Sequence, residues 1–79
     1  MSYVIALREK DDFIKIECSG RPQFQYPKID QGFLWPPAHA MIYGEKPTEM
    51  AEEYKQYYSE VLCIRLVDGH LPKKLRIKG

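Results

Sequence analysis

Four side chains in this sequence are of types that bind zinc in other proteins. They are Cys18, His39, Cys63 and His70. Their successive separations of 21, 24 and 7 residues include no short pair of the kind that anchors half of a zinc site. The spacing therefore favours two free cysteines and two ordinary histidines, and we expect no metal and no cofactor. A disulfide would require Cys18 and Cys63 to lie on neighbouring strands.

The same cysteines are the candidates for nucleophilic catalysis, which needs a thiolate. Cys18 ends an alternating apolar segment and Cys63 lies within an apolar run, and both settings raise the pKa of a thiol. Neighbouring carboxylates such as Glu52 and Glu53 point in different directions on a helix. The sequence also lacks a glycine-rich phosphate loop. We therefore expect a protein that is not an enzyme; an enzyme would need Cys63 beside a histidine.

The most unusual segment is GRPQFQYPKIDQGFLWPP, residues 20–37, which combines four prolines with four aromatic residues. Proline interrupts regular strand pairing, yet the segment is too aromatic for a solvated linker. Tyr, Trp and Arg often dominate protein–protein interfaces. We expect a surface that binds another protein through this loop and the neighbouring sheet edge. The candidate contacts are Arg21, Tyr26, Lys28, Trp35 and Tyr57.

Core packing is the competing interpretation of these aromatic residues, because large side chains fill a small core efficiently. Both interpretations stay open for Phe24, Phe33 and Trp35. For the 33–35 segment we expect the chain to fold back against the core, leaving Pro36 and Pro37 at the rim of the contact surface.

The C-terminal segment suggests an alternative function, binding to nucleic acid. The predicted basic patch comprises Arg65, Lys73, Lys74, Arg76 and Lys78. Against this function, residues 45–60 hold five glutamates and two lysines, and the net charge of the chain is only +1. Lysines on an edge strand also prevent unwanted edge-to-edge pairing without binding any ligand.

Length and composition limit the classes of protein to which this chain can belong. A chain of 79 residues with 44% hydrophobic residues is expected to form one compact domain, residues 1–79. Two cysteines are too few for a secreted disulfide scaffold. The N-terminal apolar run is too short for a signal peptide, and no run reaches the roughly 20 apolar residues of a membrane span. We expect a cytoplasmic protein, bacterial or made inside a host cell, with no membrane partner.

Hydrophobic patterning predicts an α+β fold. The helix is expected at about 47–59, where Pro47 favours a helix start and glutamates occupy the first turns. Its apolar face comprises Met50, Tyr54, Tyr57, Tyr58 and Val61, with Tyr57 at the flank of this face and expected to be exposed. The expected strands are 3–8, 13–18, a short edge strand at 23–26, 40–43, a central strand at 61–67 and a returning strand at 70–77. Residues 28–32 are expected to be a loop, and Asp68-Gly69 a two-residue hairpin turn.

These elements predict an antiparallel or mixed sheet of four to six strands packed against one amphipathic helix, in the order ββ(β)–loop–β–α–β–β. The polar side chains of Lys15 and Glu17 alternate with apolar ones, which indicates a sheet with one face in water.

The layout resembles that of many small proteins of phages and mobile elements. The likeness rests on the opening Met-x-Tyr-Val-Ile, a hairpin, a loop, then Ala-x-x-Tyr at 40–43 before a glutamate-rich helix and a final strand. Some of those proteins inhibit host enzymes or defence complexes. The resemblance favours a binding protein and assigns no functional residue. Taken together, the sequence features lead us to expect a non-enzymatic protein-interaction module, an inhibitor, adaptor or subunit that acts alone or as a homodimer.

Overall fold

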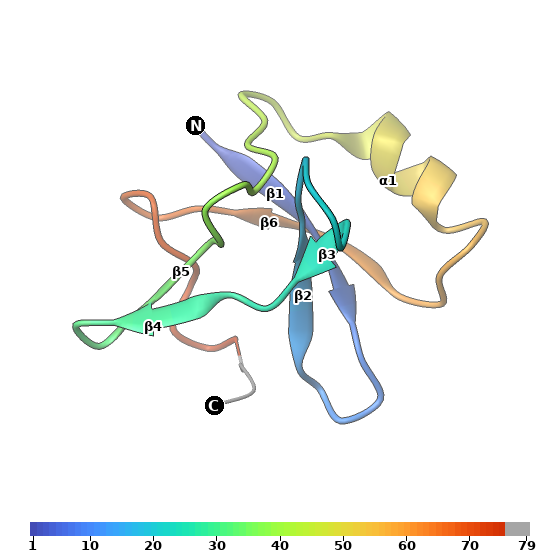
Figure 1. Cartoon of the computed structure of the whole chain (residues 1–79). Helices are drawn as coiled ribbons and strands as arrows, with labels where there is room; N and C mark the ends of the chain where they lie inside the picture. Colours follow the sequence, from blue (N-terminus) through green and yellow to red (C-terminus); the bar gives the residue numbers. More distant parts are fainter. Residues whose placement is uncertain (76–79) are drawn as a thin grey trace.

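The computed structural model describes residues 1–75 of the chain. Its elements, drawn in Figure 1, are β1 (Tyr3–Arg8), β2 (Ile14–Glu17), β3 (Phe24–Gln25), β4 (Lys28–Asp30), β5 (Phe33–Trp35), α1 (Thr48–Tyr54) and β6 (Val61–Arg65). Within these 75 residues, no helix has the length and apolar character needed to cross a bilayer.

Four strands form an antiparallel sheet in the order β3-β2-β1-β6, and β4 and β5 form a separate two-stranded sheet. Strand β1 is the central strand: Ala6 is opposite Ile16 of β2 on one side and opposite Leu62 of β6 on the other. The predicted α+β class, with an antiparallel sheet and one helix, is confirmed.

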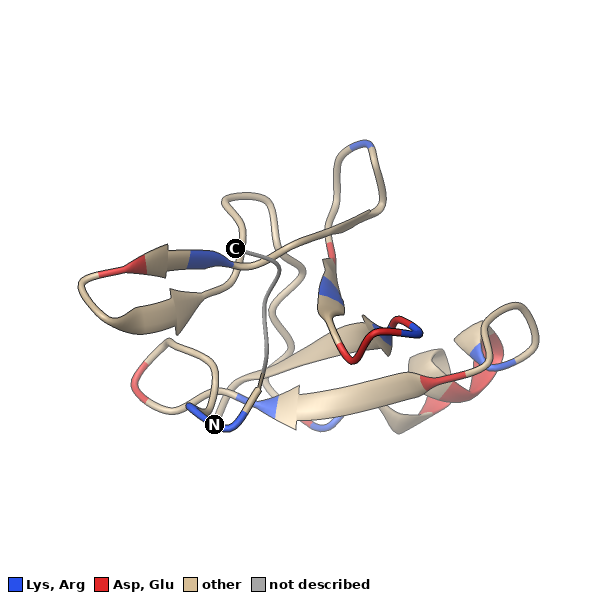
Figure 2. Cartoon of the chain, turned by 90° about the horizontal axis from the view of Figure 1, so that it is seen from below, with Lys and Arg blue, Asp and Glu red and all other residues tan. Residues whose placement is uncertain are grey.

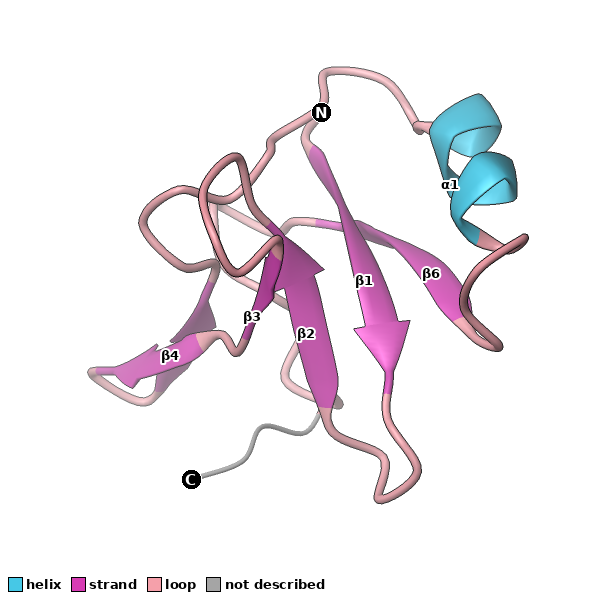
Figure 3. Cartoon of the chain, turned by 45° about the vertical axis from the view of Figure 1, so that its right-hand side comes forward, coloured by secondary structure: helices cyan, strands magenta, loops and turns pink. Residues whose placement is uncertain are grey.

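Both faces of the four-stranded sheet are covered, so the molecule has three layers (Figure 3). On one face, β1 contributes Ile5 to a cluster with Ala51 of α1 and Phe24 of β3. On the other, β1 contributes Val4 to a cluster with Leu34 of β5. The remaining buried members of this second cluster are Ala6, Ile14, Ile16, Ile64, Leu66 and Leu71. The helix and the β4–β5 hairpin therefore lie on opposite sides of the sheet.

Covering both faces corrects the expectation of one wet face. Glu17, predicted to face water, is only 5% exposed. It lies opposite Phe24 on the face that the helix covers, because successive side chains of a strand point to opposite faces. The strand at 61–67 also differs from prediction: it is the shorter β6 at the edge of the sheet. Its apolar sequence reflects two covered faces rather than two neighbouring strands.

Three predicted segments have a different backbone. Residues 28–32, expected to be a loop, contain β4 and the turn to β5. Residues 40–43 form no strand but make isolated bridges at each end, from Ala40 to Cys18 and from Tyr43 to Tyr3. The returning strand at 70–77 is absent from its described part: Val67 and His70 form one isolated bridge, and residues 71–75 are irregular. Residues 76 and 77 lie outside the described part of the chain.

Two hairpin turns have positive φ at both central residues. The φ angles are 51° at Gln31 and 80° at Gly32, and 50° at Asp68 and 85° at Gly69. This pattern belongs to the type I′ turn, whose twist matches that of the flanking strands. The predicted turn at Asp68-Gly69 is thus confirmed, and a second one makes the β4–β5 hairpin.

Helix α1 is shorter than the predicted 47–59. It ends at Tyr54, after which the amides of Gln56 and Tyr57 bond to carbonyls three residues back. Six residues then connect the helix to β6, which begins at Val61. Its predicted apolar face is only partly buried, and Ala51 is the one fully buried helical residue.

A hydrogen-bonded cluster around Glu17 joins four segments. The Tyr43 hydroxyl donates to Glu17 Oε1 at 2.6 Å, and the Tyr54 hydroxyl donates to Oε2. Gln23 Nε2 in turn donates to the Tyr54 hydroxyl at 2.8 Å. Among the described residues, no lysine or arginine forms an ion pair with Glu17. Two phenols therefore satisfy a buried carboxylate, which needs hydrogen-bond partners when it is removed from water.

The phenols are held in their neutral, donating form. Burial, together with the hydrogen bond to Glu17, raises the pKa of Tyr43 and of Tyr54 above the usual value of a tyrosine. The cluster thus ties β2 to the chain before the helix and to the last residue of the helix.

The first prediction concerns this cluster. Tyr54→Phe removes a donor to the buried carboxylate, and hydrogen bonds to charged groups contribute about 1.5–3 kcal/mol each. We expect the free energy of unfolding, measured by urea denaturation, to fall by about that amount. Tyr57→Phe is the matched control, because Tyr57 is 78% exposed and should change stability by less than about 0.5 kcal/mol. Equal effects of the two substitutions would contradict the role given to Glu17.

Candidate functional site

Two adjoining hollows lie between the end of helix α1 and the turn that joins β2 to β3. The first has a volume of about 430 Å³ and is lined by Leu7, Arg8, Glu9, Lys15, Pro22, Gln23, Phe24, Tyr58, Ser59 and Glu60. The second has a volume of about 350 Å³ and is lined by Gln23, Met50, Glu53, Tyr54, Gln56, Tyr57 and Tyr58. Gln23 and Tyr58 line both, so we treat them as one groove, the Tyr58 groove.

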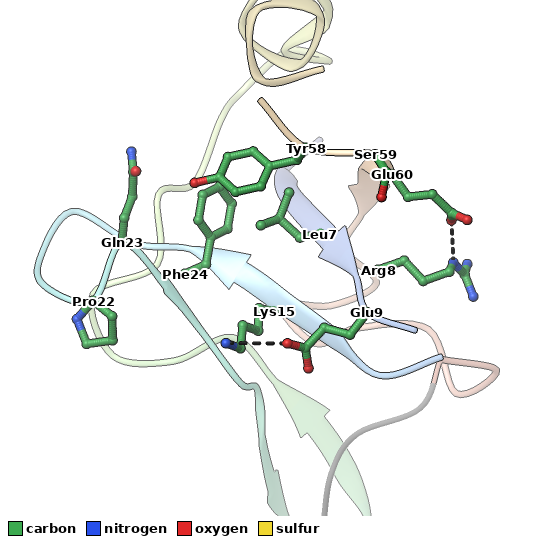
Figure 4. Close-up of a pocket in the computed structure, with 10 residues that line it drawn as sticks. All are labelled: Leu7, Arg8, Glu9, Lys15, Pro22, Gln23, Phe24, Tyr58, Ser59 and Glu60. Carbon is green, nitrogen blue, oxygen red and sulfur yellow. Dashed lines mark ion pairs between the residues drawn. The ribbon is translucent and has the colours of Figure 1, made fainter. Parts of the chain in front are cut away.

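Aromatic side chains form the centre of the Tyr58 groove. The Phe24 ring meets the Tyr54 ring edge to face at 5.3 Å and the Tyr58 ring at 5.5 Å between centroids. Figure 4 shows Tyr58, Phe24 and Leu7 close together at one end of the first hollow. Phe24 is buried, whereas Tyr58 is 39% exposed. The Tyr58 amide donates to the Tyr54 carbonyl at 3.0 Å, so one more turn after the helix places Tyr58 beside Phe24.

The second hollow ends in exposed apolar surface. Met50 is 40% exposed and Tyr57 is 78% exposed. Exposed residues of these types are enriched at protein interfaces. Tyr57 was predicted from the helical pattern as a partner contact, and the structure places it in the lining of the groove.

Paired charges border the other end of the groove. Arg8 Nε lies 3.2 Å from Glu60 Oε2, and Lys15 Nζ lies 3.4 Å from Glu9 Oε2; both ion pairs are drawn in Figure 4. The charges at this end are therefore largely neutralised by one another.

Tyr26 packs beside the Lys15–Glu9 pair. Its hydroxyl donates to Glu9 Oε1, and Lys15 Nζ lies 5.1 Å from the centroid of its ring, within cation–π range. The hydrogen bond to Glu9 raises the pKa of Tyr26 to about 12. Tyr26 thus contacts two lining residues of the groove, Glu9 and Lys15, without lining the groove itself.

The five predicted partner contacts separate into two surfaces. Tyr57 lines the Tyr58 groove, Tyr26 supports its charged end, and exposed Arg21 precedes the lining residue Pro22. Lys28 and Trp35 instead face each other in the β4–β5 hairpin.

Trp35 and Phe33 belong to an aromatic cluster with His70. The Phe33 and Trp35 ring centroids lie 4.6 and 5.6 Å from that of His70, and the Trp35 Nε1–H donates to the Asp30 carbonyl at 3.2 Å. Of the aromatics whose role was left open, Phe24 is core, whereas Phe33 is 36% exposed. Residues 33–35 pair with β4, and only Leu34 is buried in the core.

The residues of the predicted basic patch are described only in part. Arg65 ends β6 and is exposed, and Lys74 is exposed. Lys73 Nζ lies 5.5 Å from the centroid of the Phe33 ring. Arg76 and Lys78 lie outside the described residues. Binding to nucleic acid through these residues stays a prediction.

Of the candidate metal and nucleophile residues, Cys18 and His39 lie on paired segments, since Cys18 forms a bridge with Ala40 and the Ser19 amide donates to the His39 carbonyl, whereas Cys63 lies in β6. Cys18 and Cys63 are both free, because β1 separates the strand that Cys18 follows from β6, which contains Cys63. Burial raises the pKa of both thiols, as their apolar settings predict. Within residues 1–75, no group of three or more His, Cys, Asp or Glu residues is placed to hold a metal ion.

Sequence reasoning missed most of the groove's lining. The sequence patterns placed Pro22 in the proline-rich segment 20–37, Gln23 in the short edge strand and Tyr58 on the apolar face of the helix. The signal was present in one respect: Tyr58 follows Tyr54 by four residues, the spacing of neighbours on a helix. That spacing persists past the end of the helix, because the Tyr58 amide donates to the Tyr54 carbonyl at 3.0 Å.

Comparisons of the chain with protein-family models, with curated proteins and with solved structures found no match.

The second prediction follows from the contact between Tyr26 and Glu9. The ultraviolet absorbance of the phenolate, recorded for the wild type and for Tyr26→Phe, should differ by one group that ionises near pH 12. Glu9→Gln should move this ionisation towards the usual value of about 10. Because the folded pKa is raised, the stability that Tyr26 contributes is complete below about pH 10 and is lost between about pH 10 and 12.

Tyr57→Phe serves as the control for this titration, because it removes a phenol that does not contact Glu9. It should leave the ionisation near pH 12 in place. Ionisation of Tyr26 at the ordinary tyrosine value in the wild type would show that Glu9 does not hold the phenol.

Proposed function

We propose that this chain is a non-enzymatic protein-interaction module that binds a segment of another protein in the Tyr58 groove. The observation that supports this function is the continuity of the groove, from an aromatic centre around Phe24 and Tyr58 to exposed Met50 and Tyr57. A groove with a buried aromatic floor and an accessible rim provides the pocket that an interface anchor requires.

The charges around the groove favour a basic partner. Helix α1 carries more acidic than basic positions, as Figure 2 shows in red and blue. Glu53 lines the second hollow, and among residues 1–75 its carboxylate has no ion-pair partner. At the opposite end, Arg8 and Lys15 are already paired. The segment best suited to the groove has an apolar or aromatic anchor flanked by lysine or arginine.

The cluster around Glu17 favours a preformed groove. Tyr54 and Gln23 belong to the lining and are hydrogen-bonded to each other, and Tyr54 also bonds to Glu17. Side chains that are already held in place lose less conformational entropy on binding. An inhibitor, an adaptor and a subunit of a larger complex all use this kind of surface, and the proposed site of action is the cytoplasm of a bacterium or of a host cell.

The third prediction concerns peptides selected from a random displayed library for binding to the folded protein. We expect the selected peptides to share an aromatic or aliphatic anchor next to lysine or arginine. Tyr57→Ala should weaken their binding by about tenfold, or about 1.4 kcal/mol, because it removes exposed contact area without disturbing the core. Glu53→Lys should weaken binding and reduce its dependence on salt, as expected for a charge at the rim.

Two matched controls test whether binding is specific to the groove. Ile42→Ala removes an apolar side chain that is 50% exposed and lies outside the groove lining, and Glu45→Lys makes the same charge change outside it. Both should bind the selected peptides like the wild type. Peptides that bind Tyr57→Ala and Glu53→Lys as well as they bind the wild type would exclude the Tyr58 groove as the binding site.

A further inference from the structure

Strand β4 is an open edge that carries two unpaired charges of opposite sign. All three of its residues, Lys28, Ile29 and Asp30, are exposed, and Ile29 is 62% exposed. Among residues 1–75, neither the Lys28 nor the Asp30 side chain forms an ion pair. Within the described residues, strand β4 pairs only with β5, so its other side offers backbone donors and acceptors to a further strand.

The hairpin turn determines which backbone groups face outward. A two-residue turn makes Asp30 and Phe33 the hydrogen-bonded pair beside it, and hydrogen-bonded and non-bonded pairs then alternate. The N–H and C=O of Ile29, opposite Leu34, consequently point away from the partner strand. The other edge of the hairpin agrees with this alternation, since the Leu34 carbonyl accepts a bond from the Leu71 amide at 2.7 Å. The β5 edge is thus occupied there, while that of β4 is open.

We infer that two copies of this chain pair through β4 in an antiparallel, two-fold symmetric arrangement centred on Ile29. Ile29 then faces Ile29 of the second copy, and their backbones exchange two hydrogen bonds. Lys28 of each copy faces Asp30 of the other, which places two opposite-charge pairs directly across the new ladder. The two hairpins become one four-stranded sheet, β5-β4-β4-β5, whose interface is isologous.

The charges select this register over its neighbours. A shift of the pairing by two residues in one direction places Lys28 opposite Lys28, and a shift in the other direction places Asp30 opposite Asp30. Like charges directly opposite each other destabilise a ladder. The first shift also places Pro27, which lacks a backbone N–H, opposite Ile29, so one hydrogen bond of that pair is lost. Lysine on an edge usually opposes pairing, but with an aspartate two residues away it favours this one register.

Exposed apolar surface adds to the same interface. Ile29 lies on the face of the hairpin that carries Leu34, so the two Ile29 side chains meet across the two-fold axis beside the core. A two-stranded hairpin is marginally stable alone, and additional strands make a sheet more stable. The surface is separate from the Tyr58 groove, because the hairpin and the helix cover opposite faces of the main sheet.

Analytical ultracentrifugation over a range of protein concentrations tests this pairing and supplies the fourth prediction. The wild type should pass from a monomer of 9.3 kDa to twice that mass as concentration rises. Lys28→Asp and Asp30→Lys each place like charges opposite each other, and each should raise the dissociation constant by about tenfold or more. Lys10→Asp, at an exposed position outside the β4–β5 hairpin, is the control for net charge and should dimerise like the wild type.

Charge exchange tests whether β4 of one copy meets β4 of the other. An equimolar mixture of Lys28→Asp and Asp30→Lys should form a heterodimer, because each strand then meets its complement. The double variant Lys28→Asp/Asp30→Lys should dimerise with itself like the wild type, and circular dichroism of all variants checks that they are folded. The inference would be overturned by a wild type that stays monomeric up to about 1 mM. It would equally be overturned by a dimer that is insensitive to both single reversals, or if neither the mixture nor the double variant recovers dimerisation.

Discussion

The fold depends on a buried carboxylate that is held by two phenols. Helix α1 has only seven residues and buries only Ala51, and a helix of this length is not stable without tertiary contacts. Tyr54, its last residue, attaches it to the sheet through Glu17 and through an edge-to-face contact with the Phe24 ring. Tyr43 binds the other carboxylate oxygen and fixes the segment that precedes the helix. Removing either phenol would leave part of a buried charge without a partner, the costly outcome for a polar group in a core.

The same interaction connects the core to the Tyr58 groove. Gln23 donates to the Tyr54 hydroxyl and lines both hollows, while Phe24, the next residue, lies opposite Glu17 in the sheet. The two walls of the groove, the turn between β2 and β3 and the end of α1, therefore meet at one hydrogen-bonded network. A change at Glu17 reaches the groove through two hydrogen bonds, so the stability of the fold and the shape of the groove are coupled. This coupling favours a preformed surface over one that is ordered only by its ligand.

Patterns that depend on neighbouring residues predicted much of the fold. Alternation located the first two strands and the short edge strand, and the Asp-Gly pair located a type I′ turn. Glu17 could not be assigned correctly in this way, because its burial depends on Tyr43 and Tyr54, which lie 26 and 37 residues away in the sequence. For the candidate site, the exposure of Tyr57 was predictable from the helical pattern. The groove itself was not, because it forms between the end of the helix and the turn that joins β2 to β3, two segments that are far apart in the sequence.

The three-layer arrangement separates two surfaces that can act together. The helix and the β4–β5 hairpin cover opposite faces of the sheet, so pairing through β4 would leave the Tyr58 groove of each copy accessible. A dimer of this kind would present two identical grooves, and a partner with two suitable segments, or itself a dimer, would bind both. The second binding event is then intramolecular, and the overall affinity can exceed that of a single groove by orders of magnitude without any new contact. A short edge strand and a shallow groove, each weak alone, would in this way combine into a strong association.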